Sequence, residues 1–395
     1  MKHLLSISTL YPNDAKPRFG TFVARSLEAL AKRGDWRVTV VNPIGIPPVA
    51  IGRYRALADL APVSEERGVT VHRPRFTLIP KVGTRRNVGA IARSVLPLVR
   101  KLHDDEPIDL IDAQFFYPDG PAVAEIARAT GLPFSIKARG SDIAYWGDQD
   151  FARDAMLEAA RSADGVLAVS EALKSDMAAR GFPPEKIRVH YTGLDRDRFR
   201  PLDHTRLRAQ VGSALGLILA DNAPLLACVG NLSPRKGQDR AIEALPAIDG
   251  AVLILVGQGD DEDRLRSLAA ERGVAGRVHF TGAIDHFLLP LILSAADAMV
   301  LPTQSEGLAN AWVEALACGT PVITTDVGGA REIIVDDVAG RLLDDREPAT
   351  IAAAVNALLN NPPSSEEVAA HADRFSWDSH AADLAEYYST LLDRN

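Results

Sequence analysis

The chain alternates short apolar segments with segments of helical periodicity, and this alternation is the feature that most restricts its fold. Many of the apolar segments are continuous, which is typical of parallel strands covered on both faces. The candidate strands form two successive series, the first at 3–10, 36–41, 69–73, 108–113, 134–137, 166–169 and 187–190, and the second at 225–229, 252–256, 278–280, 298–301, 322–324 and 341–343. Two such series predict an α/β protein made of two doubly wound parallel-sheet domains.

The two series are separated by a polar segment, GLDRDRFRP at 193–201, which ends in proline. We therefore expect an N-terminal domain over 1–195 and a C-terminal domain over 200–372. Residues from about 375 to 395 predict a final helix that packs outside the second domain or, alternatively, crosses back to the first. Ligands of doubly wound sheets bind beyond the carboxyl ends of the strands, so we expect the active site in a cleft between the domains.

Composition excludes several classes of function. Lys and Arg number 44 against 52 Asp and Glu, a net charge of −8, which argues against a nucleic-acid binder because such a protein needs a basic face. Cys228 and Cys318 lack the spacing of metal ligands and indicate reduced packing residues, as expected in the cytoplasm. No apolar run approaches the ~18 residues of a membrane-spanning helix.

The segment 303–326, TQSEGLANAWVEALACGTPVITTD, places two carboxylates on either side of a helix start. The pattern predicts a helix from about 310 to 318, with Gly319 in the position of a C-cap glycine. Glu306 then precedes the helix and Glu314 lies one turn inside it, with unpaired backbone N–H groups between them that favour an anion. A phosphorylated sugar or nucleoside has this chemistry. The alternative is a Glu that simply precedes a helix and a second Glu that faces solvent.

A second loop, GNLSPRKG at 230–237, directly follows the strand 225–229 and precedes a helix. Gly230 permits a tight turn, and the adjacent cations Arg235 and Lys236 can neutralise a diphosphate at a helix N-terminus. The loop does not match a Walker A motif, because no Gly precedes Lys236 and no Ser or Thr follows it. A basic surface turn is the alternative. Both loops follow strands of the same series, so both are expected at the same edge of one sheet.

Gly230, the sequence RKG at 235–237, Glu306 and the sequence EA at 314–315 form one pattern, joined by VGQG at 256–259, VHFTG at 278–282, TDVGG at 325–329 with Glu332, and FSW at 375–377. This pattern resembles the family-4 retaining glycosyltransferases, which have the GT-B fold of two Rossmann-like domains facing a cleft. In the N-terminal half, Pro12, FGTF at 19–22, FYPDG at 116–120 and RGSDI at 139–143 resemble bacterial members that build teichuronic-acid-like, capsular or exopolysaccharide chains.

The resemblance implies an acceptor-binding N-terminal domain and a C-terminal domain that binds a nucleotide-sugar donor. Arg235 and Lys236 would hold the diphosphate, Glu314 the ribose, and Glu306 the donor sugar. The full donor-binding set implied by the resemblance is Gly20, Gly230, Gly257, Thr281, Gly282, Leu308, Ala309, Asn310 and Glu314. Gly257 and Gly282 are about equally well explained as simple turn residues.

The implied reaction moves a sugar, with retention at the anomeric carbon, to a saccharide or lipid-linked acceptor in cell-surface polysaccharide synthesis. In the family the leaving phosphate is thought to take the acceptor proton, so Glu306 is expected to position the sugar and not to attack it. Arg235 and Lys236 supply the positive charge that a metal would bring, so neither a cofactor nor a metal is expected. The alternatives are a nucleotide-sugar epimerase of the same fold and a non-catalytic nucleotide-sugar-binding protein.

The sequence departs from the family pattern after the strand 134–137, where many relatives carry a histidine and this chain has Arg139. A guanidinium stays charged near neutral pH, so Arg139 cannot exchange a proton there. It can donate to a phosphate or a sugar hydroxyl. Asp142 can accept from a hydroxyl or fix Arg139, and we include both residues in the candidate catalytic set.

A basic stretch from Arg73 to Lys101 contains eight Lys and Arg residues and no acidic residue: Arg73, Arg75, Lys81, Arg85, Arg86, Arg93, Arg100 and Lys101. Such a segment suits an anionic membrane surface, and it predicts a cytoplasmic protein that is peripheral on the inner face of the membrane. The alternative is a basic face that packs its apolar side on the core and binds an anionic sugar or nothing.

Overall fold

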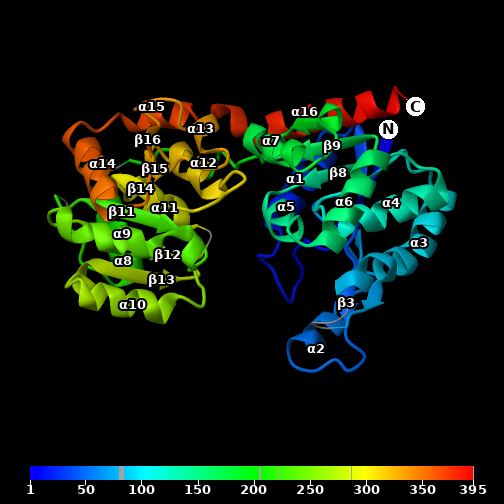
Figure 1. Ribbon diagram of the computed structural model, residues 1–395, viewed down its shortest axis with the longest axis horizontal. Helices are drawn as coiled ribbons and strands as arrows, with labels where there is room; N and C mark the ends of the chain where they lie inside the picture. Colours follow the sequence, from blue (N-terminus) through cyan, green and yellow to red (C-terminus); the bar gives the residue numbers. More distant parts are fainter. Residues whose placement is uncertain (80–83, 204–205, 221, 286, 395) are drawn as a thin grey trace. The chain divides into compact units, whose positions relative to one another are not determined.

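The chain folds into two compact units, one formed by Met1–Gly193 with Trp377–Asn395 and the other by Leu194–Ser376. The computed structural model describes residues 1–79, 84–203, 206–220, 222–285 and 287–394 (Figure 1). Along the chain, the first boundary between the units falls between Gly193 and Leu194, within the polar segment that the sequence predicted as the join. Each unit contains its own wound sheet.

The N-terminal unit is built on an eight-stranded sheet in the order β10-β9-β8-β7-β1-β2-β5-β4. Its neighbouring strands are parallel except β4 and β5, which pair antiparallel. The strands are β1 (Lys2–Ile7), β2 (Trp36–Val41), β4 (Val63–Glu66), β5 (Val69–His72), β7 (Leu110–Ala113), β8 (Phe134–Ala138), β9 (Gly165–Ala168) and β10 (Ile187–Val189). A small parallel sheet joins β3 (Ile44–Ile46) to β6 (Arg75–Thr77).

Helices of this unit fall into two groups. Helix α1 packs on α16, whereas α4 packs on both α3 and α6. Helices on both faces explain why the central strands are apolar along their whole length. The helices are α1 (Thr21–Lys32), α2 (Arg53–Ala58), α3 (Asn87–Asp105), α4 (Asp119–Thr130), α5 (Ser141–Trp146), α6 (Asp150–Ser162), α7 (Glu171–Ala179) and α16 (Trp377–Leu392).

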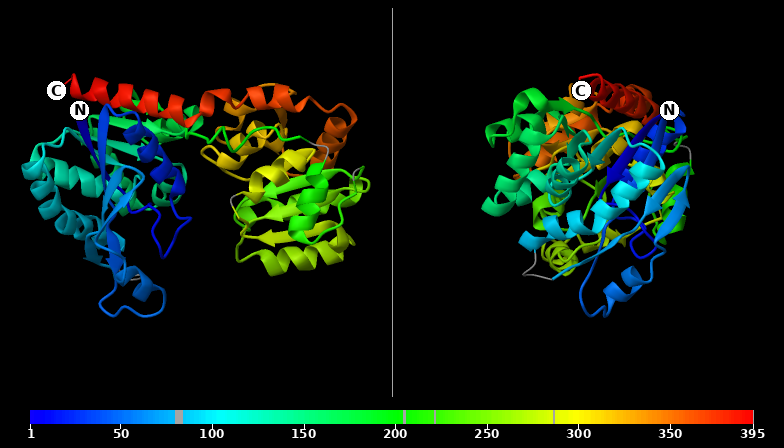
Figure 2. Two further views of the ribbon diagram at one scale, coloured as in Figure 1. Left: turned by 180° about the vertical axis from the view of Figure 1, so that it is seen from behind. Right: turned by 90° about the vertical axis from the view of Figure 1, so that its right-hand side faces the viewer.

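The final helix, α16, belongs to the N-terminal unit and not to the outside of the second one, so the second of the two placements considered from the sequence is correct. Its side chains Leu384 and Leu391 are buried in one core with Leu27 of α1. The Tyr388 ring meets Trp36 of β2 edge-on at 5.8 Å. Burial of this apolar face holds the helix here, and Figure 2 shows this red helix beside the blue N-terminal part of the chain.

The C-terminal unit contains a six-stranded, fully parallel sheet in the order β13-β12-β11-β14-β15-β16. Helix α9 contacts α10 and α14, whereas α11 contacts α8 and α12. The two units confirm the predicted class of two doubly wound parallel-sheet domains. The strands are β11 (Leu225–Val229), β12 (Val252–Val256), β13 (Val278–Gly282), β14 (Ala298–Leu301), β15 (Val322–Thr325) and β16 (Gly340–Leu343).

The helices of the C-terminal unit are α8 (Leu207–Leu215), α9 (Gln238–Ala244), α10 (Glu262–Glu271), α11 (Leu288–Ala295), α12 (Asn310–Ala317), α13 (Ala330–Ile333), α14 (Pro348–Asn360) and α15 (Ser365–Ala370). Helix α12 ends at Ala317 with Cys318 as its C-cap, and Gly319 follows as predicted, with a φ of 80° in the left-handed region that favours glycine. Among the described helices of both units, none combines the length and the apolar character needed to cross a membrane.

Candidate active site

The two loops singled out in the sequence lie side by side in the C-terminal unit. They follow β11 and β14, which are neighbours and mark the point where the strand order reverses. Their expected position at one edge of one sheet is thereby confirmed, and such reversal points are where ligands of doubly wound sheets bind. Gly237 allows the contact, because a Cβ there would lie 2.2 Å from the Pro302 carbonyl oxygen. The Gln304 amide then donates to the Arg235 carbonyl at 2.8 Å.

Charged side chains from the two loops converge on Glu306. Its Oε1 accepts hydrogen bonds from Lys236 Nζ, from Arg235 Nη1 at 3.1 Å and from Thr303 Oγ1 at 3.3 Å. The side chains of Lys236 and Glu306 are 13% and 12% exposed, whereas that of Arg235 is 46% exposed. The cluster carries one excess positive charge, and all three bonds use the same carboxylate oxygen. Among the described residues, Oε2 of Glu306 has no hydrogen-bond partner, so it is available to a ligand hydroxyl.

Backbone amides at the start of α12 follow Glu306 closely in the chain. The N-cap residue of α12 is Ala309, whose side chain has no oxygen to accept from them. Within the described part of the chain, the N–H groups of Leu308, Ala309 and Asn310 donate no hydrogen bond. Unpaired amides at a helix N-terminus favour an anion, so these three groups remain candidates for holding a donor phosphate.

Glu314 is partly buried on α12, and its carboxylate has no hydrogen-bond partner among the described residues. Burial raises the pKa of Glu314 to about 7, and the nearby charge of Arg198 opposes this effect. A carboxylate withdrawn from water and left without donors is a suitable acceptor for ligand hydroxyls. The ribose-binding role expected from the resemblance stays a prediction.

The glycines expected to line a base pocket pair with each other. The Gly257 amide donates to the Gly282 carbonyl at 3.1 Å, and Thr281 Oγ1 donates to the same carbonyl at 3.0 Å. A Cβ at Gly257 would lie 2.0 Å from the Gly230 carbonyl oxygen, so close packing of the loops itself requires glycine there. The Gly230 amide in turn donates to the Val256 carbonyl at 2.9 Å. These residues form one packed edge, and their contact with a base stays a prediction.

Two further residues support the loops, and sequence reasoning assigned neither to the site. Arg346 follows β16, and its Nε donates to the Pro302 carbonyl at 2.7 Å while Nη2 donates to the Pro234 carbonyl at 3.4 Å. Gly328 lies in the TDVGG sequence, and a Cβ there would lie 1.8 Å from the Glu306 carbonyl oxygen. The TDVGG motif was a usable signal for Gly328. No local pattern marks Arg346.

In the N-terminal unit, Arg139 follows β8 and contacts the loop after β7. Its Nε donates to the Gln114 carbonyl at 3.1 Å, and Nη2 donates to Gln114 Oε1. The guanidinium carbon lies 5.0 Å from the centre of the Phe22 ring. Burial lowers the pKa of Arg139 to about 10, so the side chain still carries its charge at neutral pH. Gln114 is the partner that the sequence did not reveal.

Asp142 is fully buried and fixes the loop that carries Arg139. Its carboxylate accepts from the backbone amides of Phe116 at 2.8 Å, Arg139 at 2.9 Å and Ile143 at 3.1 Å. Burial raises the pKa of Asp142, and these amide bonds oppose the shift. Of the two roles left open by the sequence, the fixing role agrees with this geometry. A carboxylate occupied by main-chain amides is a positioning group and does not offer itself to a substrate hydroxyl.

Gly20 lies immediately before α1, with φ of 71°, and a Cβ there would be 2.6 Å from the Leu10 carbonyl oxygen. The loop therefore closes tightly on itself just before the helix that carries Phe22. Since Phe22 also contacts Arg139, Gly20 and Arg139 belong to one group in the N-terminal unit. The residues following β11 and β14 form the other group, in the C-terminal unit.

The basic stretch does not form one surface. Arg73 is buried and donates to Ser64 Oγ at 2.7 Å and to Glu66, and Arg75 donates to main-chain carbonyls. Arg73 buries its charge on these local partners because β4 folds back on β5, whereas Arg75 is exposed although its guanidinium is hydrogen-bonded. Lys81 lies outside the described residues. The other exposed members among the described residues are Arg85, Arg86, Arg93, Arg100 and Lys101, on α3 and the turn before it.

Comparison with known proteins agrees with this architecture. Residues 217–375 match the family model Glycosyl transferases group 1, and residues 19–198 match Glycosyltransferase Family 4. The putative teichuronic acid biosynthesis glycosyltransferase TuaC of Bacillus subtilis is 32% identical over 84% of this chain and 82% of its own. A GDP-mannose-dependent alpha-(1-6)-phosphatidylinositol monomannoside mannosyltransferase of Mycobacterium tuberculosis is 33% identical over 67% of this chain and 72% of its own.

Solved structures with the same fold share little sequence with this chain. Sucrose-phosphate synthase from Thermosynechococcus elongatus has a TM-score of 0.82 at 20% identity, with full coverage of both chains. Anabaena HepE in complex with UDP has a TM-score of 0.77 at 21% identity, covering 99% of this chain and 100% of its own. From the family models and the relatives, together with this fold, the chain belongs to the group 1 glycosyltransferases of family 4, which have the GT-B fold.

Proposed function

We propose that this protein is a retaining glycosyltransferase that moves a sugar from a nucleotide diphosphate-sugar to a saccharide or lipid-linked acceptor in cell-surface polysaccharide synthesis. One observation carries the proposal. Arg235 and Lys236, in the loop after β11, both donate to Oε1 of Glu306, in the loop after the neighbouring strand β14. The names of the relatives support this class of substrate, since one is a GDP-mannose-dependent mannosyltransferase and another a teichuronic acid biosynthesis glycosyltransferase.

In the proposed reaction the bond between the anomeric carbon and the diphosphate oxygen breaks, and the acceptor oxygen forms the new bond on the same face of the sugar. The electron pair of the broken bond goes to the diphosphate, whose growing charge is stabilised by Arg235, Lys236 and the first amides of α12. The acceptor proton passes to the leaving phosphate oxygen. Oε2 of Glu306 accepts from a hydroxyl of the donor sugar, while its Oε1 stays with Lys236.

Two side chains of the loop cluster, Arg235 and Lys236, supply the positive charge that a divalent ion would bring, and we propose that neither a metal nor another cofactor is required. Transfer should then persist in excess EDTA. Loss of transfer in EDTA with recovery on adding magnesium would contradict this part of the proposal.

The reaction is proposed to occur in the cytoplasm, with the protein peripheral on the inner face of the membrane. The exposed cations at and before α3 carry this part, since Arg85, Arg86 and Arg93 can approach an anionic lipid surface. Each such cation contributes about 1 kcal/mol near the surface, and this contribution is screened by salt. Co-sedimentation with anionic vesicles at low salt tests it, and no binding would end the membrane proposal.

Incubation with a labelled donor and a native lipid extract tests the central proposal. A transferase yields a labelled acceptor, an epimerase yields a changed donor sugar, and a binding protein yields neither. Lys236→Ala should abolish transfer and weaken every nucleotide diphosphate-sugar, by about 10- to 100-fold for the loss of a charge-assisted bond. The matched control is Lys174→Ala on α7. The ion pair of Lys174 with Glu171 is long, at 3.9 Å, and such exposed pairs contribute little to stability. Unchanged affinity and turnover in Lys236→Ala would show that the diphosphate assignment is wrong.

A further inference from the structure

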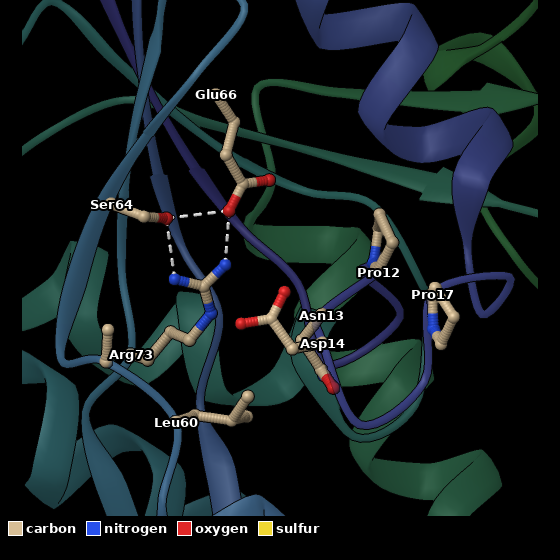
Figure 3. Close-up of a pocket in the computed structure, with 9 residues that line it drawn as sticks. Pro12, Asn13, Asp14, Pro17, Leu60, Ser64, Glu66 and Arg73 are labelled. Carbon is tan, nitrogen blue, oxygen red and sulfur yellow. Dashed lines mark hydrogen bonds and ion pairs between the residues drawn. The ribbon is translucent and has the colours of Figure 1, made fainter.

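A cavity of about 350 Å³ opens in the N-terminal unit, between the loop after β1 and the antiparallel pair β4–β5 (Figure 3). The loop contributes Asn13 and Asp14, and the strand pair contributes Ser64 and Glu66. Neither Gly20 nor Arg139 lines it, so the cavity is separate from the candidate site residues of this unit. Its volume is in the range of small-molecule sites.

The wall of the cavity contains a built polar arrangement centred on Arg73, which is 7% exposed. Arg73 Nη1 donates to Ser64 Oγ at 2.7 Å, and Nη2 donates to Glu66 Oε1. The Ser64 hydroxyl in turn donates to Glu66 Oε1 at 2.6 Å. These bonds hold the guanidinium in a fixed orientation. Among the described residues, Arg73 Nε has no hydrogen-bond partner, although it is buried.

Carboxylate oxygens around the same cavity also lack donors. Asp14 is exposed, and Figure 3 shows its carboxylate on the side of Arg73 that carries Nε. Within the described part of the chain, Asp14 nevertheless forms no hydrogen bond or ion pair. Both side-chain bonds to Glu66 end on Oε1, so Oε2 has no partner among the residues that the structure describes. An N–H group without an acceptor therefore lies near carboxylate oxygens without donors.

The charge of the cavity selects among ligands. Arg73 contributes one positive charge, and Asp14 and Glu66 contribute two negative charges. Tyr11 is fully buried, and among the described residues its hydroxyl has no hydrogen-bond partner. Burial raises the pKa of Tyr11, and the negative charges of Glu66 and Glu28 add to the shift. This net negative environment disfavours a phosphate or a carboxylate. A hydroxyl group meets both needs, because it accepts from an N–H group and donates to a carboxylate.

We propose that this cavity binds a neutral, hydroxyl-rich ring, a sugar or a cyclitol, as the part of the acceptor away from the reacting hydroxyl. The inference rests on the proposed transfer function for its place in the reaction. Ring hydroxyls would bridge Asp14 and Arg73, and the apolar lining of Pro12 and Leu60 would contact the C–H faces of the ring. The cavity thus binds the neutral part of the acceptor.

Ligand-observed NMR on the full chain without a donor tests the inference, with methyl α-mannopyranoside, myo-inositol, glucosamine and inorganic phosphate as probes. At least one neutral polyol should bind, and Asp14→Ala should weaken that binding about tenfold, as for the loss of a hydrogen bond to a charged group. The matched control is Asp104→Ala, an exposed aspartate near the end of α3 that has no partner among the described residues. Both variants should fold normally, because neither aspartate holds another residue.

Four results would each overturn the inference. They are preferential binding of phosphate over the neutral probes, binding of glucosamine alone, absence of polyol binding, and equal polyol affinity in wild type and Asp14→Ala. Transfer assays separate it from the proposed function. If no sugar is transferred but polyols bind in an Asp14-dependent way, the proposed function fails and the polyol site stands. If transfer occurs, Asp14→Ala should raise the KM of the acceptor and leave the KM of the donor unchanged, and an unchanged acceptor KM would contradict a place in acceptor binding.

Discussion

Glu314 gives a prediction in which stability and ligand affinity change in opposite directions. Burial raises the pKa of this carboxyl from 4.5 to about 7, so the folded chain holds the proton more tightly than the unfolded chain. Its contribution to stability is complete below pH 4.5, is lost as the pH rises to about 7, and stays constant above that. The shift corresponds to about 3 kcal/mol. Glu314→Gln removes the charge, and it should therefore raise the free energy of unfolding at about pH 8 and leave it unchanged near pH 4.

Donor affinity should follow the ionised fraction of the same carboxyl. In the ribose-binding role that we propose for Glu314, ribose hydroxyls would donate to the charged form. The wild-type Kd for a nucleotide-sugar should then be about tenfold weaker at about pH 6 than at about pH 8, where Glu314 is ionised. In Glu314→Gln the affinity should be weaker at about pH 8 and independent of pH. GDP-mannose and UDP-glucose are the suitable titrants, because their diphosphate groups have no proton that titrates in this range.

Isothermal titration calorimetry and urea unfolding measure the two effects on the same samples. The matched control is Glu271→Gln, at the exposed end of α10, which should change neither quantity. Tight nucleotide-sugar binding that is equal at about pH 6 and about pH 8 in the wild type would refute the reasoning. So would a Glu314→Gln variant that binds as well as the wild type, because the carboxylate would then have no part in holding the ribose.

Two other substitutions test the packing of each unit. Gly257→Ala introduces a Cβ 2.0 Å from the Gly230 carbonyl oxygen, whereas a Cβ at the control position Gly276 has no atom within 4 Å. We expect Gly257→Ala to lower the free energy of unfolding in urea by about 2 kcal/mol or more and to weaken nucleotide binding. A stability equal to that of Gly276→Ala would contradict the loop contact. Burial holds the pKa of His380 well below its ordinary value of 6.5, and the ring is hydrogen-bonded to Ser26 at 2.6 Å. The unfolded chain binds a proton at this ring more tightly than the folded chain does, so the free energy of unfolding falls as the pH drops below about 6.5. In His380→Gln this fall should be smaller by about 1.4 kcal/mol per pH unit. Urea unfolding at several pH values measures the slope, and an unchanged slope would show that His380 does not contribute.

Much of the fold and part of the candidate site could be predicted from the sequence, because parallel sheets obey simple rules. Continuous apolar segments identified the central strands of both sheets. The rule that loops of parallel strands open at one edge brought Arg235 and Glu306 together although 71 positions separate them. The role of Asp142 could not be chosen in the same way. Whether a buried carboxylate meets a hydroxyl or main-chain amides depends on the path of the backbone, which the RGSDI motif does not specify.

Strand β4 (Val63–Glu66) was not predicted from the sequence, for a different reason. The sequence of β4, VSEE, is short and polar, as suits an edge strand that must not pair with another chain, and it has no apolar run to mark it. Its antiparallel pairing places Ser64 opposite Val71 and Val63 opposite His72, and this register brings Ser64 and Glu66 to Arg73. Counting basic residues along the chain assigned Arg73 to a membrane-facing surface, because its compensating carboxylate lies in a strand that no periodicity reveals. The same missed pairing forms one wall of the polyol cavity, so the new site follows from the part of the fold that was hardest to predict.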